Sequence, residues 1–337
     1  MVVAAPATSD VPVASEVPVV LDAPDAPDAP DAPDVNVGLV GFGVAGRQHA
    51  EALAGVRGFR VAAVVEANAG LTTGSLRRLP SWEVLLADPG INLVGLCLPP
   101  GGRAALALEA LKAGKAVLLE APPALSEGEV DLMVATAEQV GRPIGVMLQH
   151  RHRLPEAVRA ADWSAPSVTA TLEVSRFRPP AHFHRAGWRS DPASALGGTA
   201  AHLAVHYVDL ACQLLGAPSG VWTAPLREVR RGIDTRVTGV VEFVSGATLS
   251  FTATSEAAAS SERLRVLGPD HSLSVDNGTV SARIGDAEGV WPTLRGPSLR
   301  RLVYQDMAEA MRSGGRPRRS DLEGARAVTR ILRALRA

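Results

Sequence analysis

The stretch VNVGLVGFGVAG, residues 35–46, decides the fold of this 337-residue chain. Its apolar run stops at Gly41, and Gly43 and Gly46 complete a G-x-G-x-x-G spacing before an apolar-periodic segment, RQHAEALAGV. A second apolar run, FRVAAVV, ends at Glu66, twenty positions after Gly46. Strand, glycine turn, helix and strand-end acid in this order predict a dinucleotide-binding unit. The alternative is a glycine turn in some other α/β protein.

Each part of this unit has an expected task. Gly41 allows the turn, Gly43 lets the backbone approach a pyrophosphate, and Gly46 lets the helix pack on the strand. The helix start offers free N–H groups to the anion. The expected phosphate site is therefore Gly41, Phe42, Gly43, Val44, Ala45 and Gly46.

Glu66 favours NAD over NADP, because a carboxylate there would accept hydrogen bonds from the adenosine ribose and repel a 2′-phosphate. Asn68 offers no compensating positive charge. The alternative for Glu66 is a solvated acid at a strand end.

The composition narrows the class of protein. A formal net charge of -1 shows no basic bias towards nucleic acid or anionic membrane, and no apolar run reaches the length of a membrane span. The two cysteines, Cys97 and Cys212, lie in apolar runs, and no signal peptide is recognisable, so we expect a cytoplasmic protein. Residues 1–34, with the tandem DAPDAPDAPDAPD, are expected to form a disordered tail.

From Val35 to about residue 150, apolar strands alternate with amphipathic helices, which predicts a Rossmann domain with a mostly parallel, doubly wound sheet. Ligands of such sheets bind beyond the carboxyl ends of the strands. We expect Leu98, Pro99 and Pro100 to form a wall beside the nicotinamide-side ribose, although an ordinary strand stop would also account for the prolines.

Residues 151–337 read as an α+β domain with an open, mostly antiparallel sheet. Its segment GGTAAHLAVHYVDLACQLLG predicts a helix of about five turns. Two further helices are expected near the C-terminus, where they can pack back on the Rossmann domain.

At this point the chain resembles the Gfo/Idh/MocA family of oxidoreductases. The resemblance is carried by GFGVAGRQHAEAL, SWEVLLADPGINLVGLCLPP, EALKAGKAVLLEAPPAL and SALGGTAAHLAVHYVDLACQLLG. It implies a nicotinamide cofactor, a small sugar-like or cyclitol-like substrate, and a homo-oligomer formed through the open C-terminal sheet. It also implies that Glu120 and Ala121 border the cofactor.

The chain departs from the family pattern at three positions. The family lysine falls on Ala121, its aspartate on His202, and a histidine on Arg103. Glu120, Pro122, His206 and Asp209 retain the pattern, which places His206 in the active site.

His202, His206 and Asp209 are spaced to share one helical face. We therefore expect His206 to be the general acid/base, with His202 orienting it or sharing its proton. Two alternatives are hydrogen-bonded core histidines and a helical zinc site; further metal ligands are missing, so no metal is predicted. The expected substrate-binding residues are Gln149, Arg151, Trp188, Arg189 and Asp209.

The leading hypothesis is an NAD-dependent oxidoreductase that transfers hydride between nicotinamide and a sugar-like or cyclitol-like alcohol or ketone. Because Ala121 cannot exchange a proton, two alternatives stay open. One is non-redox chemistry in specialised metabolism, such as elimination, isomerisation or cyclisation. The other is a catalytically silent protein that binds a dinucleotide or metabolite.

Overall fold

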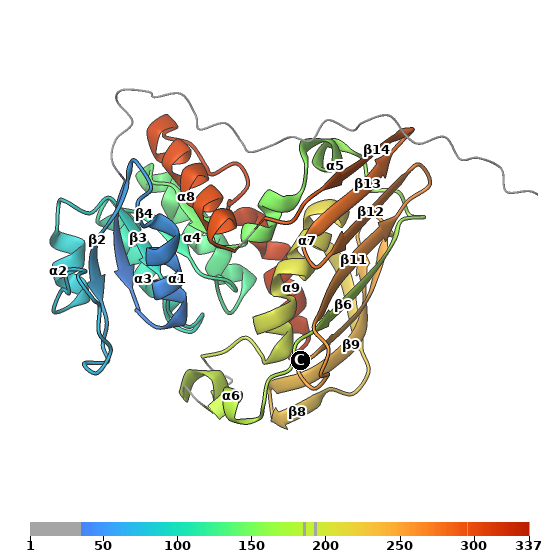
Figure 1. Cartoon of the computed structure of the whole chain (residues 1–337), viewed down its shortest axis with the longest axis horizontal. Helices are drawn as coiled ribbons and strands as arrows, with labels where there is room; N and C mark the ends of the chain where they lie inside the picture. The colour runs from blue at the N-terminus through green and yellow to red at the C-terminus, as the bar shows by residue number, and fades with distance from the viewer. Residues whose placement is uncertain (1–34, 185–186, 192–193, 295, 337) are drawn as a thin grey trace, which may run out of the picture. The chain divides into compact units, whose positions relative to one another are not determined.

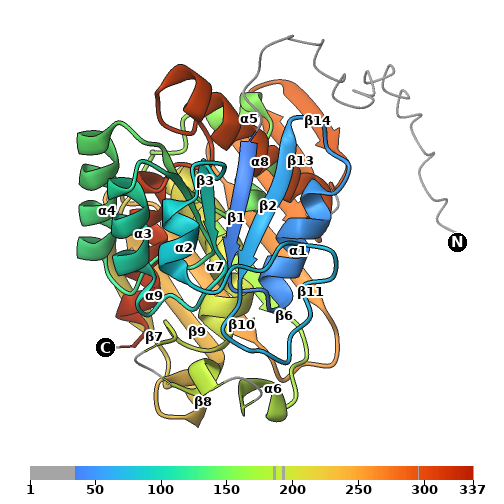
Figure 2. The same ribbon diagram turned by 90° about the vertical axis from the view of Figure 1, so that its left-hand side faces the viewer.

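A computed structural model describes residues 35–184, 187–191, 194–294 and 296–336 of the chain, so the tail expected at residues 1–34 lies outside the described residues. A five-stranded parallel sheet has the order β2-β1-β3-β4-β5 (Figures 1 and 2). Its strands are β1 (Val35–Val40), β2 (Phe59–Val65), β3 (Leu93–Leu96), β4 (Ala116–Leu119) and β5 (Ile144–Val146). Strands β3, β4 and β5 are wholly buried, as continuous apolar runs in a parallel sheet should be.

Helices cover both faces of this sheet, which confirms the predicted fold class. The connecting helices are α1 (Val44–Leu53), α2 (Trp82–Ala87), α3 (Arg103–Lys112) and α4 (Glu127–Val140). Ser81 and Ser126 cap α2 and α4 by accepting from the backbone N–H three residues on. Val94 and Leu96 pack with side chains of α3 and α4 in one cluster, whereas Leu39 packs on the opposite face.

That opposite face is completed by a helix from the far end of the chain, α8 (Gly296–Ser313). Its residues Val303, Tyr304 and Met307 are buried in the same apolar cluster as Leu39 and Leu53. The C-terminal part of the chain therefore packs against the first sheet (Figure 1).

The second sheet has nine strands in the order β14-β13-β12-β11-β6-β10-β9-β7, with β8 paired to β9. Neighbouring strands are antiparallel except for β6 and β10. The strands are β6 (Thr169–Ser175), β7 (Pro218–Thr223), β8 (Arg227–Arg230), β9 (Ile233–Phe243), β10 (Thr248–Thr254), β11 (Ser261–Leu267), β12 (His271–Asp276), β13 (Thr279–Ile284) and β14 (Ala287–Trp291).

Helices α7 (Val205–Leu215) and α9 (Arg326–Ala334) lie on one face of the second sheet (Figure 1). In the described ranges no helix covers the other face, where strands β6, β9 and β10 present mainly threonine, serine and charged side chains. Trp222 and Val240 are also exposed, at 57% and 39%.

Several short elements connect these layers. They are η1 (Gln149–Arg153), α5 (Glu156–Ala160), α6 (Ala181–His184), η2 (Gly187–Ser190), η3 (Ala200–Ala204) and η4 (Glu323–Ala325). The helix expected to run for about five turns instead begins with the π-helical turn η3 and continues as α7. No helix among the described residues is long and apolar enough to cross a membrane.

Candidate active site at the strand ends

Of the three glycines in the turn between β1 and α1, only one has open space beside it that a ligand could fill. Gly41 has a φ of +86°, and a side chain there would lie 2.7 Å from the Cys97 carbonyl oxygen. A Cβ on Gly46 would lie 2.2 Å from the Gly41 oxygen, whereas a Cβ on Gly43 would meet nothing within 4 Å. Packing within the chain therefore explains Gly41 and Gly46. The open space at Gly43, beside the start of α1, fits the phosphates of a dinucleotide.

Glu66 reaches back to this turn. Its Oε2 accepts a hydrogen bond of 2.6 Å from the Phe42 backbone N–H, and its Oε1 accepts one of 2.8 Å from Asn68. The carboxylate therefore holds the end of β2 against the glycine turn, while its remaining lone pairs can accept from ribose hydroxyls. Glu66 is therefore not simply a solvated acid at a strand end, because both of its carboxylate oxygens accept from backbone N–H groups.

Sequence reasoning missed a cation beside Glu66. Arg78 donates to the backbone carbonyls of Glu66, Asn68 and Leu71. Residue 78 forms an isolated parallel bridge with Val64 and so returns the chain to the end of β2. Because Arg78 is twelve residues from Glu66 in the sequence, local spacing did not predict that the two lie together.

Arg103 ties together the ends of β3 and β4. Its side chain is 2% exposed, and its guanidinium donates to the carbonyls of Leu98, Glu120 and Pro122. Burial lowers the pKa of Arg103 to about 10, which keeps it charged at neutral pH. Arg103 thus fixes the expected wall at residues 98–100 against the Glu120–Pro122 segment, in which the Ala121–Pro122 peptide is cis.

Glu120 is held by a buried histidine. His49 Nε2 lies 2.9 Å from Glu120 Oε1, and His49 Nδ1 lies 2.6 Å from the Tyr304 hydroxyl. Burial would raise the pKa of Glu120, but the hydrogen bond and charge of His49 lower it to about 2. Burial acts to lower the pKa of His49, yet the Cys97 thiol and the Tyr304 hydroxyl, followed by the hydrogen bond to Glu120, raise it well above its ordinary value. Glu120 is therefore a carboxylate partnered by an imidazolium, which suits it to positioning rather than proton transfer.

His206 lies on α7 with its ring against that of His150. The ring centroids are 4.7 Å apart with an interplanar angle of 34°, and Tyr207 packs edge-on against His150 at 5.1 Å. Neither His206 Nδ1 nor His150 Nδ1 has a hydrogen-bond partner in the described parts of the chain. Burial lowers the pKa of His206 to about 4, with Glu120 opposing the shift and Arg300 adding to it. His206 is thus a neutral imidazole at neutral pH, able to accept a proton.

The structure gives His206 a different neighbour from the one expected. The ring of His202 packs edge-on against Trp188, with centroids 5.4 Å apart, and lies in the π-helical turn rather than in α7. Burial lowers its pKa to about 4, with the charge of Arg189 adding to the effect. The Arg189 guanidinium stacks over Trp188 at 5.1 Å. Trp188, Arg189 and His202 therefore form a cluster of their own, and it is His150 that contacts His206.

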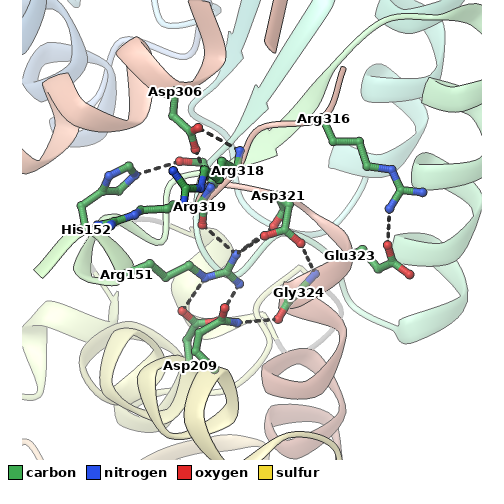
Figure 3. A network of polar contacts seen from close by, with 12 residues as sticks. Arg151, His152, Asp209, Asp306, Arg316, Arg318, Arg319, Asp321, Glu323 and Gly324 are labelled. Atoms are coloured by element: carbon green, nitrogen blue, oxygen red, sulfur yellow. Dashed lines mark hydrogen bonds and ion pairs between the residues drawn. The ribbon is translucent and has the colours of Figure 1, made fainter. Parts of the chain in front are cut away.

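Arg151 and Asp209, expected to bind substrate, face each other in the interior (Figure 3). Both side chains are 0% exposed, and Arg151 Nε and Nη2 lie 2.8 and 2.7 Å from the two Asp209 oxygens. Arg151 Nη1 also donates to Asp321 Oδ1 at 3.2 Å and to the Asp321 carbonyl at 2.9 Å. This corrects the sequence-based assignment: the fully buried pair joins η1, α7 and the segment before η4, so it holds the structure together and is not open to a substrate.

Gln149, by contrast, has a free acceptor. Its side chain is 8% exposed and its Oε1 has no partner among residues that the structure describes. Eight further buried polar atoms lack partners in the described ranges; they are Arg103 Nε, His150 Nδ1, Arg153 Nε, Arg178 Nε, His202 Nε2, His206 Nδ1, Ser261 Oγ and Arg300 Nε. Buried polar atoms normally have partners, so the unpartnered ring nitrogens of His150 and His206, which contact each other, suit a polar ligand. Within the described ranges, no group of three or more His, Cys, Asp or Glu residues could hold a metal ion.

Two family models match the chain. Residues 35–148 match the model described as "Oxidoreductase family, NAD-binding Rossmann fold", and residues 166–274 match "GFO/IDH/MocA C-terminal domain".

Two curated relatives that the chain matches are sugar dehydrogenases by name. The chain is 31% identical over 142 residues to galactose 1-dehydrogenase of Pseudomonas fluorescens, covering 42% of this chain and 45% of that protein. It is 33% identical over 172 residues to D-xylose 1-dehydrogenase (NADP(+)) 2 of Haloferax volcanii, covering 50% and 51%. These matches span about half the length of the relatives.

Solved structures share the fold over nearly the whole chain. UDP-N-acetylglucosamine 3-dehydrogenase GnnA from Acidithiobacillus ferrooxidans superposes with a TM-score of 0.72 at 23% identity, covering 88% of this chain and 95% of that one. Levoglucosan dehydrogenase in complex with NADH and levoglucosan gives 0.74 at 20% identity, covering 89% and 95%. With both halves matched by models of one family and the fold shared throughout, the chain belongs to the Gfo/Idh/MocA oxidoreductase family, with its NAD-binding Rossmann fold.

Proposed function

We propose that the protein is an NAD-dependent oxidoreductase acting on a small sugar-like or cyclitol-like alcohol or ketone. One observation carries the proposal: the glycine turn leaves open space at Gly43, and the buried, neutral imidazole of His206 lies close enough to Glu120, at the end of β4 in the same sheet, for that carboxylate to act on its pKa. The names of the relatives support the reaction class and the substrate class.

The chain's residues would divide the work as follows. Amides of residues 41–46 bind the pyrophosphate, Glu66 accepts from the adenosine ribose, and residues 98–100 line the nicotinamide side. The bound nicotinamide supplies hydride transfer. His206 accepts the hydroxyl proton as the alcohol is oxidised, and returns it in the reverse direction. Gln149, Trp188, Arg189 and His202 are proposed to contact the substrate. Glu120 is proposed to border the cofactor and, through its bond to His49, to fix the backbone at Ala121.

Glu66 supports NAD as the preferred dinucleotide. Its two oxygens already accept from Phe42 and Asn68, which fixes a negative charge where a 2′-phosphate would have to sit. Arg78 is held by three hydrogen bonds to backbone carbonyls of residues 66, 68 and 71, which leaves fewer of its donors for a phosphate.

The direct test follows the absorbance of reduced nicotinamide while the protein is screened against aldoses, polyols and cyclitols. On an active substrate, His206→Ala should lower kcat/KM by about 10²–10⁴-fold, the usual contribution of a general acid/base. His271→Ala is a matched control, because His271 lies on β12 of the second sheet, where its ring packs on Trp163 and not on His206. Near-normal turnover by His206→Ala would refute the assignment of the base.

The same screen addresses the alternatives that Ala121 leaves open. Tight NADH binding without turnover would indicate a silent binding protein, and no NADH binding would indicate a pocket used for non-redox chemistry. Ala121→Lys should raise dehydrogenase activity if the rest of the site is intact.

We further propose a division at about residue 150 into a cofactor-binding and a substrate-binding domain, with homo-oligomers formed through the uncovered face of the second sheet. The exposed Trp222 on that face is compatible with an interface. The unpaired thiols of Cys97 and Cys212 support a reducing, cytoplasmic location.

A further inference from the structure

Two arginines next to the His150–His206 pair, Arg153 and Arg300, form no ion pair among the described residues; the charges of Glu262 and Glu120 act on them only from beyond hydrogen-bond distance. Arg153 Nη1 donates to the Gly278 carbonyl at 3.0 Å and to Thr293 Oγ1 at 2.6 Å, and Arg300 Nη2 donates to Gln48 Oε1 at 2.6 Å. Across the described ranges these neutral oxygens are their hydrogen-bond partners, and the Nε of each arginine is buried without one.

Backbone geometry brings both arginines to the imidazole pair. Arg153 follows His150 by three residues in the 3₁₀ helix η1, where side chains at that spacing lie above one another. Arg300 and Tyr304 are four apart on α8 and so share its face towards α1, where Tyr304 bonds His49 and His49 bonds Glu120. The charges of Arg153 and Arg300 act on both imidazoles, lowering the pKa of each in addition to burial.

Two other charged groups around the pair, Arg176 and Glu120, have partners of opposite charge. Arg176 is paired with Glu262, which also accepts from the Tyr207 hydroxyl at 3.3 Å. Glu120 is paired with His49. Arg103 adds a further cation, bound to carbonyls alone. The crevice therefore holds an excess of positive charge, carried by guanidinium groups with donors to spare.

We propose that the substrate is an acid: a sugar-like alcohol or ketone bearing a carboxylate or phosphate, which Arg300 and Arg153 bind while the reacting carbon faces His206. Guanidinium groups are the side chains best shaped for these anions. The proposal rests on the proposed function in taking this crevice as the substrate site. The anionic group of such a substrate would also supply hydrogen-bond acceptors for the Nε atoms of Arg153 and Arg300, which lack partners among the described residues.

The test uses the full chain saturated with NADH, with ligand binding followed by calorimetry. The probes are matched sets that differ at one carbon: glucose, glucuronate and glucose 6-phosphate, and the three corresponding galactose compounds. At low ionic strength the acidic members should bind at least roughly tenfold more tightly than the neutral one, as expected for charge-assisted hydrogen bonds. Comparing the affinities of the uronate and the sugar phosphate within one set shows which acidic group the site prefers.

Variants assign the effect to the arginines. Arg300→Gln should abolish most of the preference for the acid, Arg300→Lys should keep part of it, and Arg153→Gln should weaken it. Arg312→Gln is the control, because Arg312 lies on the same helix in an exposed pair with Glu309. Equal binding of neutral and acidic sugars, no binding of any acid, or a preference that survives Arg300→Gln and Arg153→Gln together would overturn the proposal.

A separate arm uses inorganic phosphate without sugar. Phosphate should bind the NADH-loaded chain weakly and lose this binding in Arg300→Gln. Phosphate binding that NADH abolishes would assign the arginines to the cofactor's own phosphates and would overturn an acidic substrate. NADH binding is measured first in the same preparation, so a failure of the proposed function is seen before, and apart from, a failure of anion recognition.

Discussion

At the scale of single residues, the glycines of the first turn separate a packing role from a binding role. Gly43→Ala should leave stability unchanged, because its methyl group meets nothing within 4 Å, but should weaken NADH binding by filling the phosphate space. Gly46→Ala should destabilise the fold itself, because its Cβ would lie 2.2 Å from the Gly41 oxygen. Thermal melting and NADH titration of both variants test this. Unaltered NADH affinity in Gly43→Ala would contradict the phosphate site.

Glu66 allows a second test at this scale. Glu66→Ser should weaken NAD binding by roughly tenfold through lost hydrogen bonds to a charged group, and should improve NADP relative to NAD by removing a negative charge. Parallel titrations with both dinucleotides measure the ratio of affinities. Glu51→Gln, an exposed position on α1, should leave that ratio unchanged; an equally unchanged ratio in Glu66→Ser would remove the basis for NAD preference.

The residues of the crevice were predictable from the sequence only where local spacing determines them. The glycine turn and Glu66 follow from one strand–turn–helix unit, and His206 follows from the family resemblance. Arg300 was not predictable, because only the packing of α8 against α1 brings it to Glu120. Arg78 was missed for the same reason: its position depends on how the chain returns to the end of β2.

At the scale of elements, the buried Arg151–Asp209 pair joins η1 to α7 (Figure 3). Asp209→Asn should lower the free energy of unfolding by about 3–5 kcal/mol, because it leaves a buried guanidinium without its carboxylate. Urea denaturation measures the change. Glu309→Gln breaks the exposed pair with Arg312 and should cost about 0–1 kcal/mol. Similar losses of unfolding free energy in the two variants would show that the buried pair contributes no more to stability than the exposed one.

Helical periodicity accounts for both the success and the error in this part of the chain. It placed His202, His206 and Asp209 on one helix, but it could not say what each side chain meets. Asp209 faces Arg151, which comes from η1, and His202, which lies in the π-helical turn before α7, meets Trp188. The strands of both sheets were mostly predictable, since their apolar patterns depend on burial on one or both faces.

At the scale of the whole molecule, several buried histidines make stability depend on pH. Burial lowers the pKa values of His152, His202 and His206 to about 4, from 6.5. The unfolded chain therefore binds more protons than the folded one between these values, so stability falls as the pH drops from 6.5 towards 4. Each histidine can contribute up to about 3 kcal/mol, at about 1.4 kcal/mol per pKa unit.

Urea midpoints measured across this pH range give the slope. His152→Gln should flatten it, because His152 contacts Ser320 away from the crevice and its replacement does not titrate. Glu120, whose pKa falls from 4.5 to about 2, should add to the loss once the pH drops below about 4.5. A midpoint that does not change between pH 6.5 and 4 would mean that these imidazoles are charged in the folded protein.

Arg103 has a consequence for how the enzyme would respond to its surroundings. It sets a permanent cation at the ends of β3 and β4, next to Ala121, where the family resemblance places a lysine. A lysine ammonium group can both attract an electron-rich oxygen by its charge and exchange a proton with it. Under the proposed function the two tasks would belong to separate side chains: Arg103 would contribute a fixed positive charge, and His206 would exchange the proton. Protonation of His206 in acid should then stop turnover while the charge of Arg103 persists and dinucleotide and substrate can still bind.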